Sequence, residues 1–210
     1  MEIKKIIYTG MIYNFTKSLQ YEKQQTSRAD AFYTDVLKAT EIKRFNTDSD
    51  ADMEMQRQDV DVLLIVNEKA YEISEKFRAV DYGDMYLEVY SKYPDKLGWL
   101  HTGKPDIIFY FTPLSVYRIT HRSLQTFWFE LLFPALPNPW FKHFYQSKKS
   151  IVSKQLKVGN NTFKINLISA FNFENTHWVT IGISLPFEVL IENGVQIKKY
   201  YLPESNYLLL

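Results

Sequence analysis

The amino-acid sequence predicts an α/β (α+β) protein, with a mixed β-sheet core flanked by helices in residues 1–135 and a β-rich extension in residues 136–210. The first observation is a pair of apolar runs separated by two turn-forming residues, which is the pattern of a β-hairpin. The second is a pair of segments whose apolar residues are compatible with one face of a helix. The third is an alternation of apolar and polar residues after prolines 134, 137 and 139. We expect the extension to pack on the core as one structural unit.

The elements follow in order along the chain. Residues 1–15 are apolar and aromatic and predict a strand or a packed arm. A helix is expected from about residue 16 to 40, where Pro and Gly are absent, and a polar connection around 46–52. Strands are expected at 59–66, 70–77, 85–90 and 106–111, a helix at 123–133, and further strands at 155–158, 162–167, 177–185 and 194–202.

Composition excludes several classes of protein. The chain has 210 residues and 46% hydrophobic residues, enough to bury a core, and it has no cysteine. Disulfide frameworks, thiolate metal sites and cysteine nucleophiles are therefore excluded. The first residues are too few and too charged for a signal peptide, and no apolar run reaches about 18 residues. We therefore expect a cytoplasmic protein without a membrane partner.

Positive charge is concentrated in one part of the sequence. Residues 112–173 contain eight Lys and Arg but one acidic residue, Glu130, although the net charge of the whole chain is only +1. Such segregation fits a surface that faces phosphate groups, and equally a solvated face of a β-rich appendage. The basic residues of this segment are Arg118, Arg122, Lys142, Lys148, Lys149, Lys154, Lys157 and Lys164.

The predicted hairpin brings acidic and basic side chains to one side. Because side chains alternate along a strand, Asp59 and Asp61 share one face, and Glu72, Ser74 and Lys76 share a face of the partner strand. Metal-dependent hydrolysis of a phosphodiester needs this grouping. Carboxylates bind Mg²⁺, the metal lowers the pKa of its bound water, and a lysine stabilises developing negative charge. The alternative interpretation is an ordinary hairpin with a solvated charged face.

Three stretches of this region resemble the core of the PD-(D/E)XK phosphodiesterases. They are residues 61–66, residues 71–78, which contain the string Glu-Lys-Phe-Arg, and residues 85–89. The sequence is most similar to small phage and bacterial members in which such a string ends the second core strand. The later pair Gly98-Trp99 also suits that subgroup. The resemblance covers residues 57–111 and implies a restriction-endonuclease-like fold.

The resemblance also implies roles for individual residues. The metal-binding aspartate of the first core strand corresponds to Asp61, and the catalytic lysine of the second corresponds to Lys76. The acidic residue expected two positions before that lysine is replaced by Ser74. Glu75 points to the opposite face unless the strand contains a bulge. The implied catalytic residues are therefore Asp61, Glu75 and Lys76, with metal ligands among Asp61, Glu72, Glu75 and Glu88 and with Glu22 as an additional candidate.

The activity implied by the resemblance is Mg²⁺- or Mn²⁺-dependent hydrolysis by an endonuclease acting on nucleic acid, with DNA as the expected substrate, in a bacterial or phage-infected cell. Arg78 and the basic residues 118, 122, 142, 148 and 149 are the expected contacts to the nucleic acid. Ser74 favours an alternative, a non-catalytic protein of the same fold that binds nucleic acid or a protein partner. A third hypothesis is a purely protein-directed factor that contacts its partner through the aromatic-rich C-terminal part, and a homodimer is compatible with each of these.

Two aromatic segments and four histidines have competing interpretations. Residues 127–133 predict a buried helix rather than a base-stacking surface. Residues 140–145 interleave aromatic rings with Lys142 and His143, which fits base stacking, a packed linker or a dimer contact. The histidines at 101, 121, 143 and 177 show no metal-ligand spacing and are expected at the surface or satisfied in the core.

Overall fold

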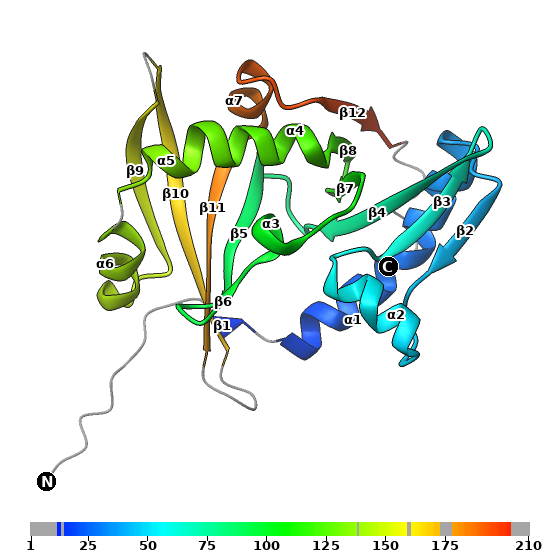
Figure 1. Cartoon of the computed structure of the whole chain (residues 1–210), viewed down its shortest axis with the longest axis horizontal. Coiled ribbons are helices and arrows are strands. Elements are labelled where there is room, and N and C mark those ends of the chain that lie inside the picture. The colour runs from blue at the N-terminus through cyan, green and yellow to red at the C-terminus, as the bar shows by residue number, and fades with distance from the viewer. Residues whose placement is uncertain (1–11, 14, 138, 159–160, 173–177, 203–210) are drawn as a thin grey trace, which may run out of the picture.

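The structure, a computed structural model, describes residues 12–13, 15–137, 139–158, 161–172 and 178–202 (Figure 1). It confirms the predicted mixed α/β fold, with two six-stranded sheets flanked by helices. The first sheet contains β1 (Ile12–Tyr13), β5 (Asp84–Lys92), β6 (Lys96–Leu97), β9 (Ile151–Val158), β10 (Asn161–Asn172) and β11 (Trp178–Pro186). The second contains β2 (Glu41–Arg44), β3 (Val62–Val66), β4 (Lys69–Phe77), β7 (Ile107–Phe111), β8 (Ser115–Thr120) and β12 (Ile197–Tyr201).

Helices lie on both sheets and between them. The N-terminal helix α1 (Phe15–Ala31) continues into a π-helix, η1 (Phe32–Val36), and a second continuous helical segment crosses the upper part of Figure 1. That segment is made of α4 (His121–Thr126), the π-helix η2 (Phe127–Leu132) and α5 (Phe133–Ala135). The remaining helices are α2 (Asp50–Arg57), α3 (Trp99–Thr102), α6 (Pro139–Ser147) and α7 (Phe187–Glu192).

The predicted hairpin is β3 followed by β4. Its two turn residues, Asn67 and Glu68, have φ values of 49° and 63°. Positive φ at both central positions is the geometry of the two-residue turns that match the twist of the flanking strands. Further along the sheet β4 pairs in parallel with β7, and the crossover between them contains β5, β6 and α3.

Strand β7 separates two hydrophobic cores. All five of its residues are buried, as expected for a strand covered on both faces. Ile108 and Tyr110 point into the larger core, which includes the first sheet and the helical segment that begins with α4. Ile107, Phe109 and Phe111 point into the smaller core against α1 and η1. The second sheet is therefore a wall shared by both cores.

The C-terminal part is rich in strands, as predicted, and it contributes to both sheets. β9, β10 and β11 join the first sheet, where Leu87 of β5 pairs with Ile183 of β11. β12 instead pairs with β8 at the edge of the second sheet. Residues 136–210 therefore include strands that are integral to the two sheets of the chain.

Most predicted elements have counterparts, but seven elements of the structure were not predicted: β2, α2, β6, α3, β8, α6 and α7. The helix predicted from residue 16 to 40 ends earlier, at Val36, and is followed by β2. The polar connection around 46–52 contains the start of α2, whose N-terminus is capped by Ser49 through a bond from the Asp52 N–H at 3.2 Å. Of the N-terminal arm, residues 12 and 13 form β1, whereas residues 1–11 and 14 lie outside the described residues.

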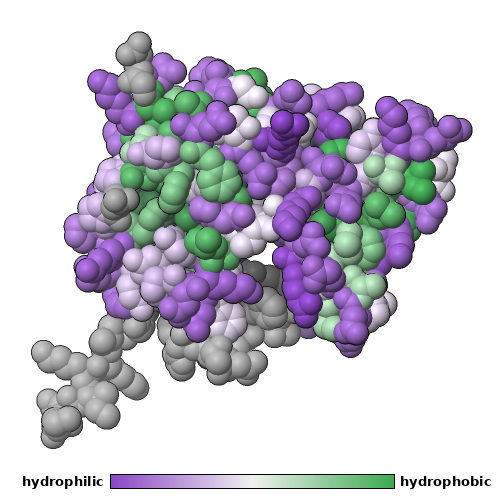
Figure 2. Space-filling view, in the orientation of Figure 1, coloured by the Kyte–Doolittle hydropathy of each residue, from purple (hydrophilic) through white to green (hydrophobic). Residues whose placement is uncertain are grey.

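The aromatic segments pack as helices with mixed exposure. Within the 127–133 segment Phe127 and Trp128 are buried, as predicted, while Phe129 and Phe133 are each 43% exposed. Figure 2 shows apolar side chains gathered on this face near α5. In the described part of the chain, no helix combines the length and the apolarity that crossing a membrane requires.

Candidate active site

The C-terminus of α2 places Asp59 at the centre of the candidate site. The Asp59 N–H donates to the Gln56 carbonyl and the Val60 N–H donates to the Met55 carbonyl, each at 3.0 Å. This is the Schellman arrangement, which requires a left-handed residue just after the helix. Asp59 occupies that position with a φ of 59°, a conformation that Asp tolerates better than most residues.

The antiparallel register of β3 and β4 then sets which side chains meet. Val62 pairs with Ile73. Continuing that register past the start of β3 places Asp61 opposite Ser74, and Asp59 opposite Lys76. Lys76 Nζ lies 2.7 Å from Asp59 Oδ1, and Ser74 Oγ lies 2.7 Å from Asp59 Oδ2 and 3.4 Å from Asp61 Oδ2. The predicted sharing of one face by Asp59, Asp61, Ser74 and Lys76 is thus observed.

Asp61 is a carboxyl group with limited access to water. Its Oδ2 accepts a hydrogen bond from the Glu75 N–H at 2.7 Å. Burial raises the pKa of Asp61 from 3.8 to about 7, because desolvation and the neighbouring Asp59 charge outweigh the attraction of Lys76. At neutral pH this carboxyl group is therefore divided between its protonated and ionised forms.

Lys76 remains a cation in the same cluster. Burial acts to lower its pKa, but the Asp59 and Asp61 carboxylates outweigh this effect and raise the pKa of Lys76 above its ordinary value. The side chains of Lys76 and Asp59 are only 21% and 19% exposed. The ammonium group also lies 5.3 Å from the centre of the Trp99 ring, within the range of a cation–π contact.

Glu88 reaches the cluster from the other sheet, on β5. Burial raises the pKa of Glu88, while Lys76 and a hydrogen bond from the Trp99 N–H oppose the shift. Gly98 leaves room for this residue, because a Cβ there would lie 2.4 Å from the Glu88 carbonyl oxygen. Gly103, at the other end of α3, similarly lies against Asp59, because a Cβ at position 103 would lie 3.1 Å from the Asp59 Cβ. The two glycines let α3 pack closely over the cluster.

Glu75 lies on the opposite face of β4, as strand alternation predicted. The pairing of β4 with both neighbours runs without a bulge. The Glu75 carboxylate accepts hydrogen bonds from Tyr33 Oη at 2.8 Å and from Arg44 Nη1 at 2.8 Å. Arg44 also pairs with Asp30 at 2.7 Å. The Glu75 side chain is only 6% exposed and is committed to this ion-pair network.

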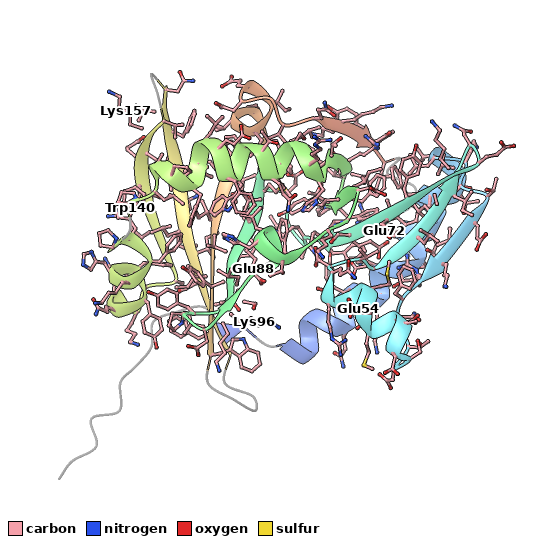
Figure 3. All side chains as sticks on the ribbon, in the orientation of Figure 1. Glu54, Glu72, Glu88, Lys96, Trp140 and Lys157 are labelled. Carbon is pink, nitrogen blue, oxygen red and sulfur yellow. The ribbon has the colours of Figure 1, made fainter. Side chains whose placement is uncertain are left out.

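Two other predicted acidic residues have different positions. Glu72 precedes Ser74 on the same face of β4, but the contact found for it is made by its backbone N–H, which donates to Asp106 at 2.9 Å. Figure 3 shows Glu72 on β4, well away from Glu88. Glu22, on α1, is close enough to Lys76 and Glu75 to be influenced by both charges, and burial raises its pKa. The structure therefore brings Asp61, Lys76, Glu88 and Glu22 into one neighbourhood and leaves Glu72 outside it.

A cleft lies between α1 and the end of β4. One cavity of about 300 Å³ is lined by Asp61, Glu75, Arg44 and other residues, and a second of about 220 Å³ is lined by Lys76 and Arg78. The two cavities share Glu22 and Phe77, so they adjoin. Aromatic rings dominate the wall of the smaller cavity: Tyr21, Phe77, Tyr86, Trp99 and Tyr110.

The donor atoms around Asp61 fit a divalent cation in their chemistry but not in their arrangement. Carboxylate oxygens are the ligands that Mg²⁺ and Mn²⁺ prefer. However, both Asp59 oxygens are already engaged, by Lys76 and Ser74. No group of three or more His, Asp or Glu side chains within the described ranges is placed to hold a metal ion. The ligand set is therefore not preformed.

The basic residues predicted to contact nucleic acid fall into separate groups. Arg78 lines the aromatic cavity, lies 3.7 Å from Asp84 and is near the Tyr86 ring. Arg118 and Arg122 line a different cavity. Lys142 lies on α6, and the lysines at 148 and 149 follow that helix at the far end of the molecule from β4 in Figure 1.

The sequence provided little indication of a role for Asp59, and His121 was expected at the surface or satisfied in the core. Asp59 was placed on the correct face, but its ion pair with Lys76 depends on the unpredicted end of α2. The pattern Ser-x-x-Asp at 49–52 was the available signal for that helix. His121 is buried, and its Nε2 has no hydrogen-bond partner among the residues that the structure describes. The Asp59 and Lys76 charges both influence the pKa of His121, which burial lowers.

Comparisons of the chain with protein-family models, with curated proteins and with solved structures find no match. The resemblance to PD-(D/E)XK phosphodiesterases therefore rests on the local motif and stays a prediction.

Proposed function

We propose that the cleft between α1 and β4 hydrolyses phosphodiester bonds of nucleic acid, with DNA as the first substrate to test. The observation that supports this proposal best is the joint placement of Asp61 and Lys76 through Ser74 and Asp59, beside a cleft of suitable chemistry. Perturbed acidic groups clustered with a lysine in a cleft are typical of catalytic sites.

Asp61 has the properties of a general base. A carboxyl group with a pKa of about 7 combines a substantial ionised fraction at neutral pH with enough basicity to accept a proton from water. Lys76, which stays protonated, would stabilise the negative charge that develops on the phosphoryl oxygens. The expected pH dependence is an increase in rate as pH rises through about 7, when Asp61 loses its proton.

The neighbouring cavity offers contacts for the rest of a nucleotide. Arg78 supplies positive charge at its wall, and Tyr86 and Trp99, each of which has a cation near its ring, supply aromatic surface for a base. This combination of a cation with aromatic surface favours nucleic acid over a small phosphorylated metabolite as the ligand of the cleft.

The dependence of cleavage on Mg²⁺ or Mn²⁺, which the sequence predicts, is measured in the cleavage assay. The carboxylates do not form a ready ligand set in the described residues, so the proposed roles of Asp61 and Lys76 need no metal ion.

The test is a cleavage assay on linear, supercoiled, branched and single-stranded DNA, with Mg²⁺, with Mn²⁺ and with a chelator. Asp61→Asn and Lys76→Met should each reduce the rate at least about a hundredfold, the scale expected for a general base or a charge-stabilising group. Glu72→Gln is the matched control, because it removes a charge from the same strand outside the cluster. Equal cleavage by wild type and Asp61→Asn would contradict the assignment of the site.

A specific observation also favours the non-catalytic alternative. Ser74 is fully buried at the position where an acidic residue is expected, and the charge of Lys76 is already paired with Asp59. A cluster whose charges are paired with one another needs no substrate, so its role can be purely structural. This alternative predicts DNA or protein binding without cleavage and without dependence on divalent cations, and a binding assay on the same DNA substrates with and without Mg²⁺ measures the DNA-binding part.

A further inference from the structure

A third cavity, of about 420 Å³, lies where α4 meets the β7–β8 pair of the second sheet. It shares no lining residue with the cleft described above. Its wall comes from the start of β4, the loop before β7, the end of β8 and the first turns of α4. The polar residues that line it are Tyr71, Asp106, Arg118, Thr120, His121, Arg122 and Gln125.

Two arginines give this cavity its charge. Arg118 is half-buried on β8 and Arg122 is exposed on α4. Neither takes part in any of the ion pairs found among the described residues. Lys198 is directly opposite Arg118 on β12, so its side chain starts on the same face of the sheet. The Lys198 ammonium lies 4.7 Å from the centre of the Tyr200 ring and does not line the cavity, so the wall itself contributes two cations, Arg118 and Arg122.

The acidic residue in the wall is Asp106, and its carboxylate is partly committed. It accepts a hydrogen bond from the Glu72 N–H at 2.9 Å. The cavity wall thus keeps an excess of positive charge from Arg118 and Arg122.

Uncharged groups complete the donor set. Thr120 and Tyr71 contribute hydroxyl groups to the wall, and Gln125 contributes an amide that makes only a long contact, 3.5 Å, with the Gly103 carbonyl. His121 is hydrogen-bonded to the Pro105 backbone, and its buried Nε2 has no partner among the described residues.

We propose that this cavity binds a phosphate group. Guanidinium groups recognise phosphate through paired hydrogen bonds, and neutral hydroxyl and amide donors add to that recognition. The volume exceeds that of a lone phosphate, so the site has room for the organic group that carries it. The proposal does not rest on hydrolysis in the cleft, because the two sites share no lining residue.

The experiment is calorimetric titration of the full-length protein with inorganic phosphate and with a 5′-phosphorylated dinucleotide. Arg118→Gln and Arg122→Gln should each weaken binding at least about tenfold, because each removes charge-assisted hydrogen bonds. Lys157→Gln is the matched control, since it removes an exposed cation on β9 that does not line the cavity, and it should bind as the wild type does.

The variant Asp106→Asn distinguishes a site for phosphate from a site for a cationic ligand. The asparagine oxygen can still accept the Glu72 N–H, while the negative charge is lost. Binding of phosphate should therefore tighten about threefold or more, whereas a site for a cationic ligand would weaken.

Competition identifies the source of the phosphate group. If an oligonucleotide without a terminal phosphate displaces inorganic phosphate, the cavity takes a phosphodiester of nucleic acid. If only the phosphorylated dinucleotide and free phosphate compete, it takes a terminal or free phosphate. The proposal is overturned if the wild type shows no heat with either probe, or if Arg118→Gln and Arg122→Gln bind as tightly as the wild type.

Discussion

Replacing Asp61 by asparagine should change the stability of the protein in a pH-dependent way. The asparagine keeps an oxygen that can accept the Glu75 N–H and the Ser74 hydroxyl, so the hydrogen bonds at 2.7 and 3.4 Å have a substitute. It removes the negative charge that is otherwise held close to Asp59. The variant therefore isolates the cost of that charge from the cost of the hydrogen bonds.

The magnitude follows from the shift in pKa. The pKa of Asp61 rises from 3.8 to about 7 on folding, which corresponds to about 4 kcal/mol at 25 °C. Between these two values the folded protein keeps a proton that the unfolded chain has lost, so the free energy of unfolding falls as pH rises.

Urea unfolding of wild type and Asp61→Asn at pH 4, 5, 6, 7 and 8 measures this effect. The difference in free energy of unfolding, variant minus wild type, should become more positive by about 4 kcal/mol from pH 4 to pH 8. Common titrations of other groups cancel in this difference.

Asp52→Asn is the matched control with the opposite sign. Hydrogen bonds from the Thr47 hydroxyl and N–H lower the pKa of Asp52, so its contribution to stability is present above pH 4 and lost as pH falls further. The difference between Asp52→Asn and wild type should therefore be negative and flat above pH 5. A flat difference for Asp61→Asn as well would refute the reasoning about its burial.

Three further substitutions test other parts of the site. Lys76→Met leaves two carboxylates without their cation and should lower the free energy of unfolding by about 2–3 kcal/mol at pH 8; an unchanged urea midpoint would contradict the ion pair. Gly98→Ala would place a Cβ 2.4 Å from the Glu88 carbonyl oxygen and should cost about 1–3 kcal/mol, whereas tolerance in thermal unfolding would show that α3 can move away. Tyr33→Phe removes the hydroxyl that donates to Glu75 and should cost about 1–2 kcal/mol by the same urea assay, with no loss expected if water replaces the bond.

The local geometry of the site was predictable from the sequence. The two-residue turn at Asn67-Glu68 sets the register of the hairpin. The alternation of side chains along β4 then places Ser74 and Lys76 on one face and Glu75 on the other. These relations depend on neighbours in one hairpin, and the physical rules for them are short-range.

The surroundings of the hairpin were not predictable in the same way. Glu88 reaches Lys76 because β5 belongs to the other sheet, a placement decided by pairing with β11 far along the chain. Arg44 meets Glu75 through β2, whose strand pattern is too short to stand out. The linear charge excess of residues 112–173 likewise did not reveal that Arg118 and Lys142 lie in different parts of the molecule.

The pairing of β5 with β11 has a consequence for the synthesis of the protein on the ribosome. Leu87 and Ile183 are partners across about 100 positions of sequence, so at 5–20 residues per second β5 waits roughly 5–20 s for that partner to be made. The hairpin that carries Asp61 and Lys76 needs no such delay, since β3 and β4 are adjacent in the chain. The nascent chain therefore contains both strands of this hairpin well before the partner of β5 has been made. During that interval one edge of β5 lacks the strand that pairs with it in the folded protein.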